Sequence, residues 1–354
     1  MPMPCRRQAL LWLSASMMMP AFAAPQRPRH TSTDAVPWYT SQQWIRGVDL
    51  GWQLPRGRAF EEASQDLRQA LAVAPCSAAR LRDARPAWIR AMTRWESLAA
   101  AEFGPVTERR STRLIDFQPT RTRLVDQALA QPPASLKALD STGTAGKGLP
   151  ALEYLLWKRF DHPGACTYAA LLAEDITREA TALRSAMEAP VAAVASEEAS
   201  LKTRTEVFLN QLIGGVESLR WHSMGKPLES AVKGRPPAYP RRTSTAVREA
   251  WVAQWGGLRG LMQWRRQVAP AASDTAADGI PLSLYLRGRG QIRLADPLEE
   301  ALDTTDRAMG KVRPGDEATV RTAMTALSKL RSLLETQIAE AMQVSIQFTS
   351  ADGD

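Results

Sequence analysis

Apolar residues recur at three- and four-residue steps along nearly every long segment of the chain, which is the period of an amphipathic helix. Charged residues occupy the other faces of these segments, so we interpret the stripes as core-facing sides of helices rather than as a cofactor site. Four stripes show the spacing: Val320, Met324, Leu327, Leu334, Ile338 and Ala341; Trp251, Trp255, Leu258 and Met262; Val207, Leu212, Val216 and Leu219; and Leu171, Leu172, Ile176 and Leu183.

Alternation typical of β-strands is scarce, and residues 344–348 are the one candidate strand. Gly/Pro pairs mark joints between helices, and an alanine-rich stretch at residues 190–200 separates two halves. The pattern predicts an all-α fold of two helical-bundle halves, residues 35–195 and 200–350. Residue matches between the halves are not visible, so an ancient duplication is left open.

The first residues have the form of a signal peptide. Arg6 and Arg7 precede the apolar stretch from Ala9 to Phe22, and Ala21-Phe22-Ala23 fits a small-residue cleavage site. We therefore expect residues 1–23 to direct export to the periplasm or cell envelope, by either the Sec or the twin-arginine route. No other apolar run is long enough to span a membrane, so we expect no transmembrane span in the mature chain.

Removal of the signal leaves two of the 3 cysteines, Cys76 and Cys166. In an oxidising compartment two cysteines favour one disulfide, and two separate buried thiols are the alternative. The formal net charge is +8. The basic clusters at residues 235–242 and 259–266 lack the aromatic platforms of nucleic-acid binders, so we expect no nucleic-acid partner.

Sites with a recognisable catalytic pattern are hard to find. The 3 histidines, His30, His162 and His222, have no zinc-helix spacing, and no Gly-x-Ser-x-Gly elbow marks a nucleophile. The loop at residues 143–148 fails the phosphate-loop pattern, although Lys147 beside a helix start could attract an anion. Glu153 lies near the apolar side of the following helix, where a carboxylate must be paired or hydrogen-bonded. A structural salt bridge to an arginine and a ligand-binding role are both open.

Four segments, in order, resemble the imelysin-like proteins, which are related to the insulin-cleaving membrane peptidase of Gram-negative bacteria. They are Phe103–Val106 with Arg113–Phe117 and Pro119–Arg121; Gly146–Leu156; Glu217–Arg220 with Met224–Leu228; and the tail Phe348–Asp354. The resemblance covers most of the mature chain. It implies an all-α fold with two bundle-like halves.

The signature of that family is Gly-x-His-x-x-Glu at the start of a helix, where the histidine and glutamate could hold one metal ion or polar ligand. Gly148 and Glu153 match it, but Pro150 stands at the histidine position. The resemblance thus implies that Glu153 is the remaining half of the site, with iron or zinc bound weakly at most and no cofactor assigned. The candidate binding residues are Gly148, Glu153, Lys147, Asp116, Arg121 and Lys226, with Asp352 and Asp354 as possible additional metal ligands.

Two functions follow as hypotheses. The first is an exported, non-enzymatic protein that binds an unidentified ligand or envelope protein, in the setting of iron uptake with which many relatives are associated. The second is an exported imelysin-type peptidase, for which the loss of the motif histidine is unfavourable.

Overall fold

The computed structural model of the chain describes residues 38–72, 78–188, 198–263 and 279–346. The described residues form helices and turns and no strand, so the prediction of an all-α fold is confirmed. The expected strand at the C-terminus is wrong for Val344–Ile346, which are irregular, and residues 347 and 348 lie outside the described part. Residues 1–23, Cys76, Asp352 and Asp354 also lie outside it, so the predictions made for them stay predictions.

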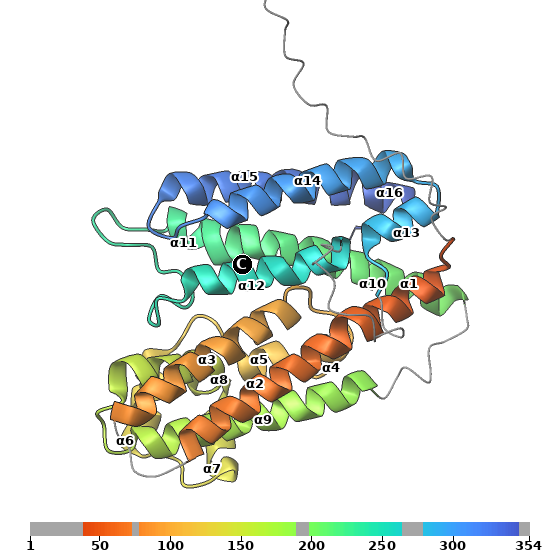
Figure 1. Cartoon of the computed structure of the whole chain (residues 1–354). Coiled ribbons are helices and arrows are strands. Elements are labelled where there is room, and N and C mark those ends of the chain that lie inside the picture. Colours follow the sequence, from red (N-terminus) through yellow and green to blue (C-terminus); the bar gives the residue numbers. More distant parts are fainter. Residues whose placement is uncertain (1–37, 73–77, 189–197, 264–278, 347–354) are drawn as a thin grey trace, which may run out of the picture. The chain divides into compact units, whose positions relative to one another are not determined.

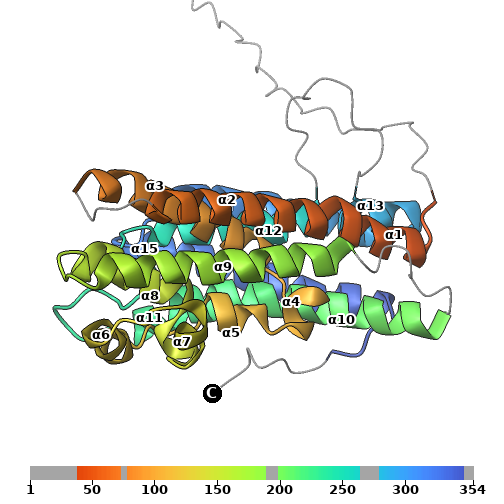
Figure 2. The ribbon, with the colours of Figure 1, turned by 90° about the horizontal axis from the view of Figure 1, so that it is seen from below.

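The helices up to Glu188 include three long ones. These are α2 (Leu54–Ala72), α3 (Ala78–Leu98) and α9 (Ala165–Glu188). Shorter helices lie between α3 and α9: α4 (Pro105–Glu108), α5 (Ser111–Ile115), α6 (Thr122–Ala130), α7 (Leu136–Asp140) and α8 (Gly148–Tyr154). The chain begins with α1 (Ser41–Gly47), which runs into α2 through the π-helical segment Val48–Gln53. Figures 1 and 2 both show α2 beside α9, and α2 also packs against α3.

The remaining helices are α10 (Glu198–Glu217), α11 (Lys226–Glu229), α12 (Val247–Met262), α13 (Leu282–Gly288), α14 (Ile292–Lys311), α15 (Glu317–Leu333) and α16 (Ala339–Ala341). The predicted long helix near the C-terminus is present, because α15 continues into α16 through the π-helical segment Leu334–Ile338. The stripe on α12 is buried throughout. On α10 the predicted core-facing position of Val207 is wrong, since Val207 is 45% exposed while its neighbour Phe208 is buried.

Two hydrophobic clusters fill the interior. One is built from α2, α3, α8 and α9 and the short helices near them, and the other from α10 and α12–α15. Helix α1 belongs to the second cluster, since Trp44 packs edge-on against Phe208 and stacks on Tyr285. Conversely, Ala246 and Ala250 of the C-terminal part join the first cluster. The predicted boundary near residues 195–200 stays a prediction.

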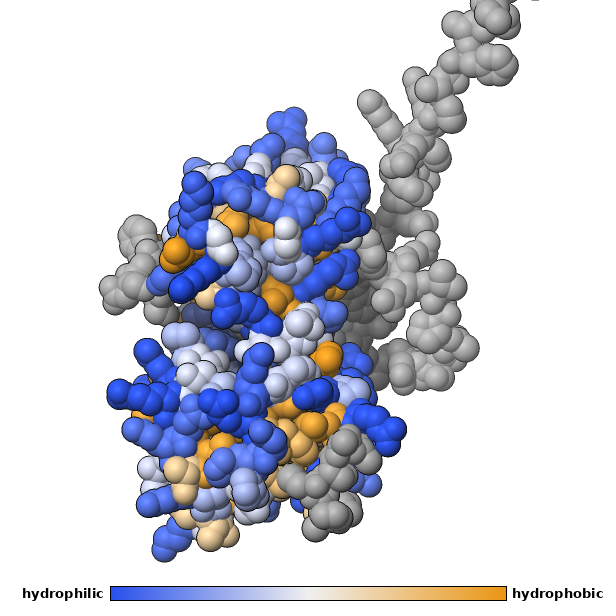
Figure 3. Space-filling model, turned by 90° about the vertical axis from the view of Figure 1, so that its left-hand side faces the viewer, coloured by the Kyte–Doolittle hydropathy of each residue, from blue (hydrophilic) through white to orange (hydrophobic). Residues whose placement is uncertain are grey.

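The surface is mainly polar. On the face shown in Figure 3, hydrophilic side chains predominate and apolar ones occur in scattered patches. Among the described residues, no helix combines the length and the apolar character needed to cross a membrane.

Candidate functional site

The start of α8 is held in place by a glycine. Gly148 has a φ of +75°, in the left-handed region that favours glycine, and a Cβ at this position would lie 2.3 Å from the carbonyl oxygen of Ile115. The missing side chain therefore lets α8 begin in contact with the end of α5. Asp116 directly follows Ile115, so this close approach brings Asp116 to the same region as the first turn of α8.

Glu153 is buried one turn into α8, with 3% of the residue exposed. Its Oε1 accepts hydrogen bonds from the backbone N–H and the hydroxyl of Ser244, each at 2.7 Å. Ser244 lies in the turn segment before α12, more than 90 residues away in the chain. The carboxylate thus joins the N-terminal helices to the segment that leads into α12.

This carboxylate interacts electrostatically with Arg241, whose side chain is fully buried. Its Nε and Nη2 donate to Glu96 Oε1 at 3.1 and 3.0 Å, and its Nη2 also donates to Asp116 Oδ2. The guanidinium carbon lies 5.8 Å from the ring centroid of Trp88, within the range of a cation–π contact. In the described part of the chain, Arg241 Nη1 has no hydrogen-bond partner although it is buried. Three carboxylates therefore surround Arg241, and its Nη1 is still an unused hydrogen-bond donor among the described residues.

Burial and charge act against each other in this cluster. Burial raises the pKa of Glu96 to about 7; the Arg241 guanidinium opposes the shift, and the negative charges of Asp116 and Glu153 add to it. For Arg241, burial alone would lower the pKa, but the carboxylates of Asp116, Glu96 and Glu153 raise it. Arg241 consequently stays charged, and the cluster as a whole favours holding one proton near neutral pH.

A cleft of about 640 Å³ opens beside the cluster, and Asp116 lies in its wall. We call it the Asp116 cleft; its polar lining comprises Glu102, Thr112, Arg113, Asp116, Gln118, Asn210, Gln211, Ser218, His222 and Gln254. Burial raises the pKa of Glu102, and the charge of Asp116 raises it further. The side chains come from α10, α12 and the segments around α5, so residues distant in the sequence meet here. A small polar ligand could reach Asp116 through this cleft.

The other residues predicted from the sequence lie elsewhere. Lys147 is buried, and its Nζ lies 3.0 Å from both Asp140 Oδ1 and Asp175 Oδ2, in an ion-pair network with α7 and α9. Arg121 is exposed just before α6, and Lys226 is exposed at the start of α11. The structure thus brings together Gly148, Glu153 and Asp116. Whether any of the six binds a ligand stays a prediction.

The cluster does not fit a metal ion. The position among its carboxylates is held by the Arg241 guanidinium, Glu153 Oε1 already accepts two hydrogen bonds, and Pro150, buried in α8, offers no ligand atom. Across the described ranges, no group of three or more His, Cys, Asp or Glu side chains is arranged to hold a metal ion. The expected weak iron or zinc binding is therefore not supported by a preformed site in this part of the chain.

Sequence reasoning missed Glu96, Arg241 and Ser244. Arg241 belongs to the basic cluster at residues 235–242, whose residue pattern predicts no burial for any one of its arginines. A positive φ of 65° at Arg241, followed by another of 62° at Thr245, bends the backbone inward there. Pro240 before Arg241 was the available signal of a turn, but it does not tell which of two adjacent arginines is buried.

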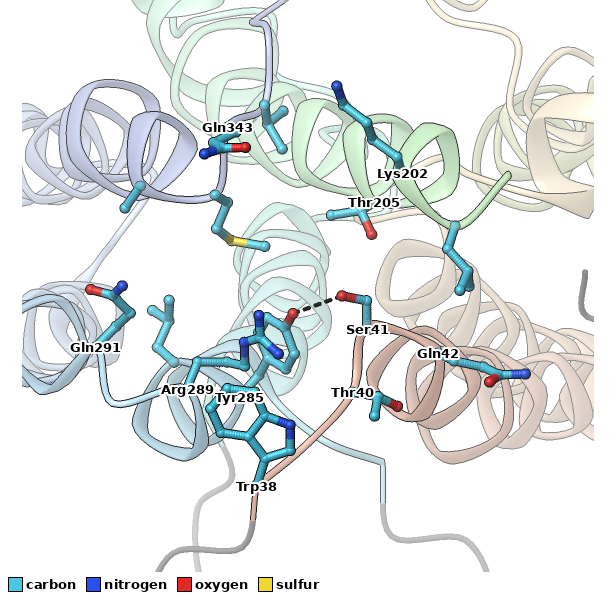
Figure 4. Close-up of a pocket in the computed structure, with 15 residues that line it drawn as sticks. Trp38, Thr40, Ser41, Gln42, Lys202, Thr205, Tyr285, Arg289, Gln291 and Gln343 are labelled. Carbon is cyan, nitrogen blue, oxygen red and sulfur yellow. Dashed lines mark hydrogen bonds between the residues drawn. The ribbon is translucent and has the colours of Figure 1, made fainter. Parts of the chain in front are cut away.

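A separate cavity of about 1000 Å³ lies where the ends of α1, α10, α13 and α16 meet. Figure 4 shows Ser41 and Tyr285 joined at its edge by a hydrogen bond of 3.0 Å, with Thr205 directed toward the open space. Its charged residues, Lys202 and Arg289, are exposed, and Arg289 lies 4.2 Å from the ring of Trp38. None of the six binding residues predicted from the sequence is in its lining as the structure describes it.

Comparison with known proteins places the chain in a family. The Imelysin model (Peptidase M75) matches residues 54–339. A crystal structure of an imelysin-like protein from Psychrobacter arcticum 273-4 superposes with a TM-score of 0.72 at 19% identity, covering 87% of this chain and 97% of the other.

A crystal structure of a proposed iron-regulated protein A precursor from Parabacteroides distasonis ATCC 8503 gives a TM-score of 0.67 at 15% identity, covering 85% of this chain and 95% of the other. At these identities the likeness concerns the fold alone. No curated protein matches the chain. The match of the family model over most of the chain, together with the shared all-α fold, shows that the protein belongs to the imelysin family.

Proposed function

We propose that this protein is an exported, non-enzymatic imelysin that binds a small polar ligand or an envelope protein through the Asp116 cleft, in the setting of iron acquisition. The observation that carries the proposal is the use of Glu153. The motif carboxylate is engaged by Ser244, and the buried guanidinium of Arg241 lies among the carboxylates of the same cluster. In this chain the motif residues Gly148 and Glu153 lie with Asp116, which forms part of the wall of the cleft. We therefore propose ligand binding in that cleft and not a metal-dependent reaction.

The place and setting rest on other observations. Residues 1–23 have the sequence of a signal peptide, which favours the periplasm or cell envelope. The Parabacteroides protein of similar fold is described as iron-regulated, and this motivates the iron setting. Fractionation of the native bacterium would locate the mature protein, and its presence in the cytoplasm would contradict export.

The cleft itself is tested by reversing a charge in its wall. Arg113 is exposed in the Asp116 cleft, and Arg123 is an exposed arginine on α6 that does not line it. In a strain that lacks the gene, we expect wild type and Arg123→Glu to restore growth on limiting iron and Arg113→Glu to fail. Normal growth of the deletion strain on limiting iron would refute the iron setting. Equal complementation by both variants would refute the proposal that the Asp116 cleft is the binding site.

A peptidase remains the second candidate because of one feature of the cleft. Glu102 and Asp116 are a pair of carboxylates, and the raised pKa of Glu102 is a property of general acids. Incubation with an unfolded protein, with and without chelator, separates the two functions. We expect no cleavage. Cleavage abolished by Glu102→Gln, or by chelator, would overturn the non-enzymatic proposal.

A further inference from the structure

A third cavity, distinct from the Asp116 cleft, contains an arginine that has no acidic partner among the described residues. The cavity has a volume of about 460 Å³ and lies between the π-helical segment before α2 and the helix α12. We call it the Arg56 cavity; its lining comprises Gly51, Trp52, Arg56, Val252, Trp255, Gly256, Arg259, Gly260, Gln263 and Asp306.

Arg56 is half-buried and contacts only neutral groups. Its Nε donates to Ser97 Oγ at 3.3 Å, its Nη1 donates to the Trp52 carbonyl at 3.1 Å, and its guanidinium lies 4.6 Å from the Trp52 ring. Among the described residues, no carboxylate lies within ion-pair distance of it. Burial lowers the pKa of Arg56 to about 10, and the positive charge of Arg94 lowers it further. A charge that is removed from water in this way normally has a partner of opposite sign.

Asp306, the one carboxylate in the lining as far as the structure describes it, is already engaged. Asp306 accepts from Arg259 Nε through Oδ2 and from Trp255 Nε1 through Oδ1, both at 2.7 Å. Arg259 also donates to the backbone carbonyl of Gln263. The acid is therefore already paired with the second arginine, and within the described ranges the charge of Arg56 has no carboxylate of its own.

One residue of the lining, Gln263, carries an unused acceptor, and the cavity has open space. Gln263 Oε1 is buried and has no hydrogen-bond partner in the part of the chain that the structure describes. A Cβ on Gly256 would meet nothing within 4 Å, and one on Gly260 would lie 2.7 Å from Arg56 Nη2. The glycines thus leave the guanidinium accessible from the cavity.

We propose that the Arg56 cavity binds a phosphate group. The guanidinium of Arg56 supplies paired N–H donors that match the oxygens of a phosphate, and the charge of Arg94 adds long-range attraction. A protonated phosphate oxygen donates to Gln263 Oε1. The rings of Trp52 and Trp255 leave room for a small organic body, so the ligand is either inorganic phosphate or a phosphate ester.

Calorimetric titration of the mature protein with inorganic phosphate tests the site. Arg56→Met removes the charge, and Arg58→Met is the matched control, because Arg58 is on the same helix but is exposed and paired with Glu188. We expect wild type and Arg58→Met to bind phosphate equally, and Arg56→Met to bind about ten-fold more weakly or not at all. Absence of binding by wild type, or equal binding by Arg56→Met, would overturn the proposal.

Two further measurements sharpen the test. Gly256→Leu adds a side chain to the lining at a position where a Cβ meets nothing within 4 Å, and it should abolish binding while thermal unfolding shows an intact fold. Retained binding would contradict the location. Sulfate carries no proton at neutral pH and should bind more weakly than phosphate, whereas equal affinity would refute the Gln263 contact. Phenyl phosphate distinguishes the ligands, since tighter binding than inorganic phosphate identifies an ester and weaker binding identifies the free ion.

Discussion

Two arginines withdrawn from water, Arg241 and Arg56, have opposite surroundings. Arg241 is fully buried among Glu96, Asp116 and Glu153, so its charge is more than compensated. Arg56 is half-buried against a serine, a carbonyl group and a tryptophan ring, and the charge that acts on its pKa is that of another arginine, Arg94. From this difference we infer a structural role for Arg241 and a ligand-binding role for Arg56.

The largest expected effect is loss of the compensated arginine. Arg241→Met would leave three carboxylates buried around an apolar side chain, and we expect the free energy of unfolding to fall by about 3–5 kcal/mol. Urea unfolding followed by circular dichroism measures it. Arg242→Met is the control, because Arg242 is exposed and makes one long hydrogen bond to the Pro236 carbonyl. Similar stability of the two variants would show that the cluster does not stabilise the fold.

Alanine substitutions of one glycine in each region should change the stability in the same order, with the larger loss at Gly148 and the smaller at Gly260. Gly148→Ala combines a left-handed φ with a backbone clash against Ile115, so we expect a loss of at least about 2 kcal/mol. A Cβ on Gly260 would clash only with the flexible end of Arg56, at 2.7 Å, and would be in ordinary contact with the Trp52 ring. Alanine also improves helix propensity, so the effect of Gly260→Ala on stability should be under about 1 kcal/mol. Chemical unfolding of both variants is the measurement, and a larger loss for Gly260→Ala would reverse the comparison.

A smaller effect concerns pH. The pKa of Glu96 is about 7 in the folded protein, and its ordinary value of 4.5 applies to the unfolded chain. Between these two values the folded state therefore holds a proton that the unfolded chain releases. Stability from this group is present at low pH and is lost as the pH rises through about 7, with a slope of at most about 1.4 kcal/mol per pH unit.

Glu96→Gln should remove this component. The free energy of unfolding of wild type, relative to that of the variant, should decline between about pH 5 and 8. The groups that face Glu96 are Arg241, Asp116 and Glu153, and all remain in the variant. Parallel pH profiles for wild type and variant would mean that Glu96 is not the titrating group.

The smallest expected change in stability is at the uncompensated arginine. Arg56→Met removes a half-buried charge that has no acidic partner in the described part of the chain, so we expect the free energy of unfolding to stay within about 0.5 kcal/mol of wild type or to rise. Thermal unfolding in phosphate-free buffer measures it. A loss as large as that of Arg241→Met would show that Arg56 is a structural residue, and the two regions would then be alike.

Much of the local structure was readable from particular residues. The stripe Trp251, Trp255, Leu258 and Met262 predicted α12, and Pro163-Gly164 predicted the start of α9. The stripe through Val207 did not predict its exposed face. The periodicity of a helix defines its apolar side only on average, and the side that is buried depends on the neighbours that pack there.

The candidate site was only half predictable. Glu153 and Gly148 were found because the motif keeps them near one helix start, and Asp116 because it lies in a family-like segment. Glu96 and Ser244 carry no local signal, since each acts through a partner about 90–145 residues away. The choice between Arg241 and Arg242 depends on a backbone turn with positive φ, which the sequence does not specify for a non-glycine residue.

The sequence by itself determined the helical class, the family and the missing histidine, because all three are local patterns of residue type and spacing. Only the tertiary structure decided which charges are buried and with whom. Burial and pairing depend on segments that meet in space. Among the residues that the structure describes, Arg241 acquired three carboxylates and Arg56 none, although both are plain arginines in the chain. The free energy of a charge is set by its surroundings, and those surroundings are built by the fold.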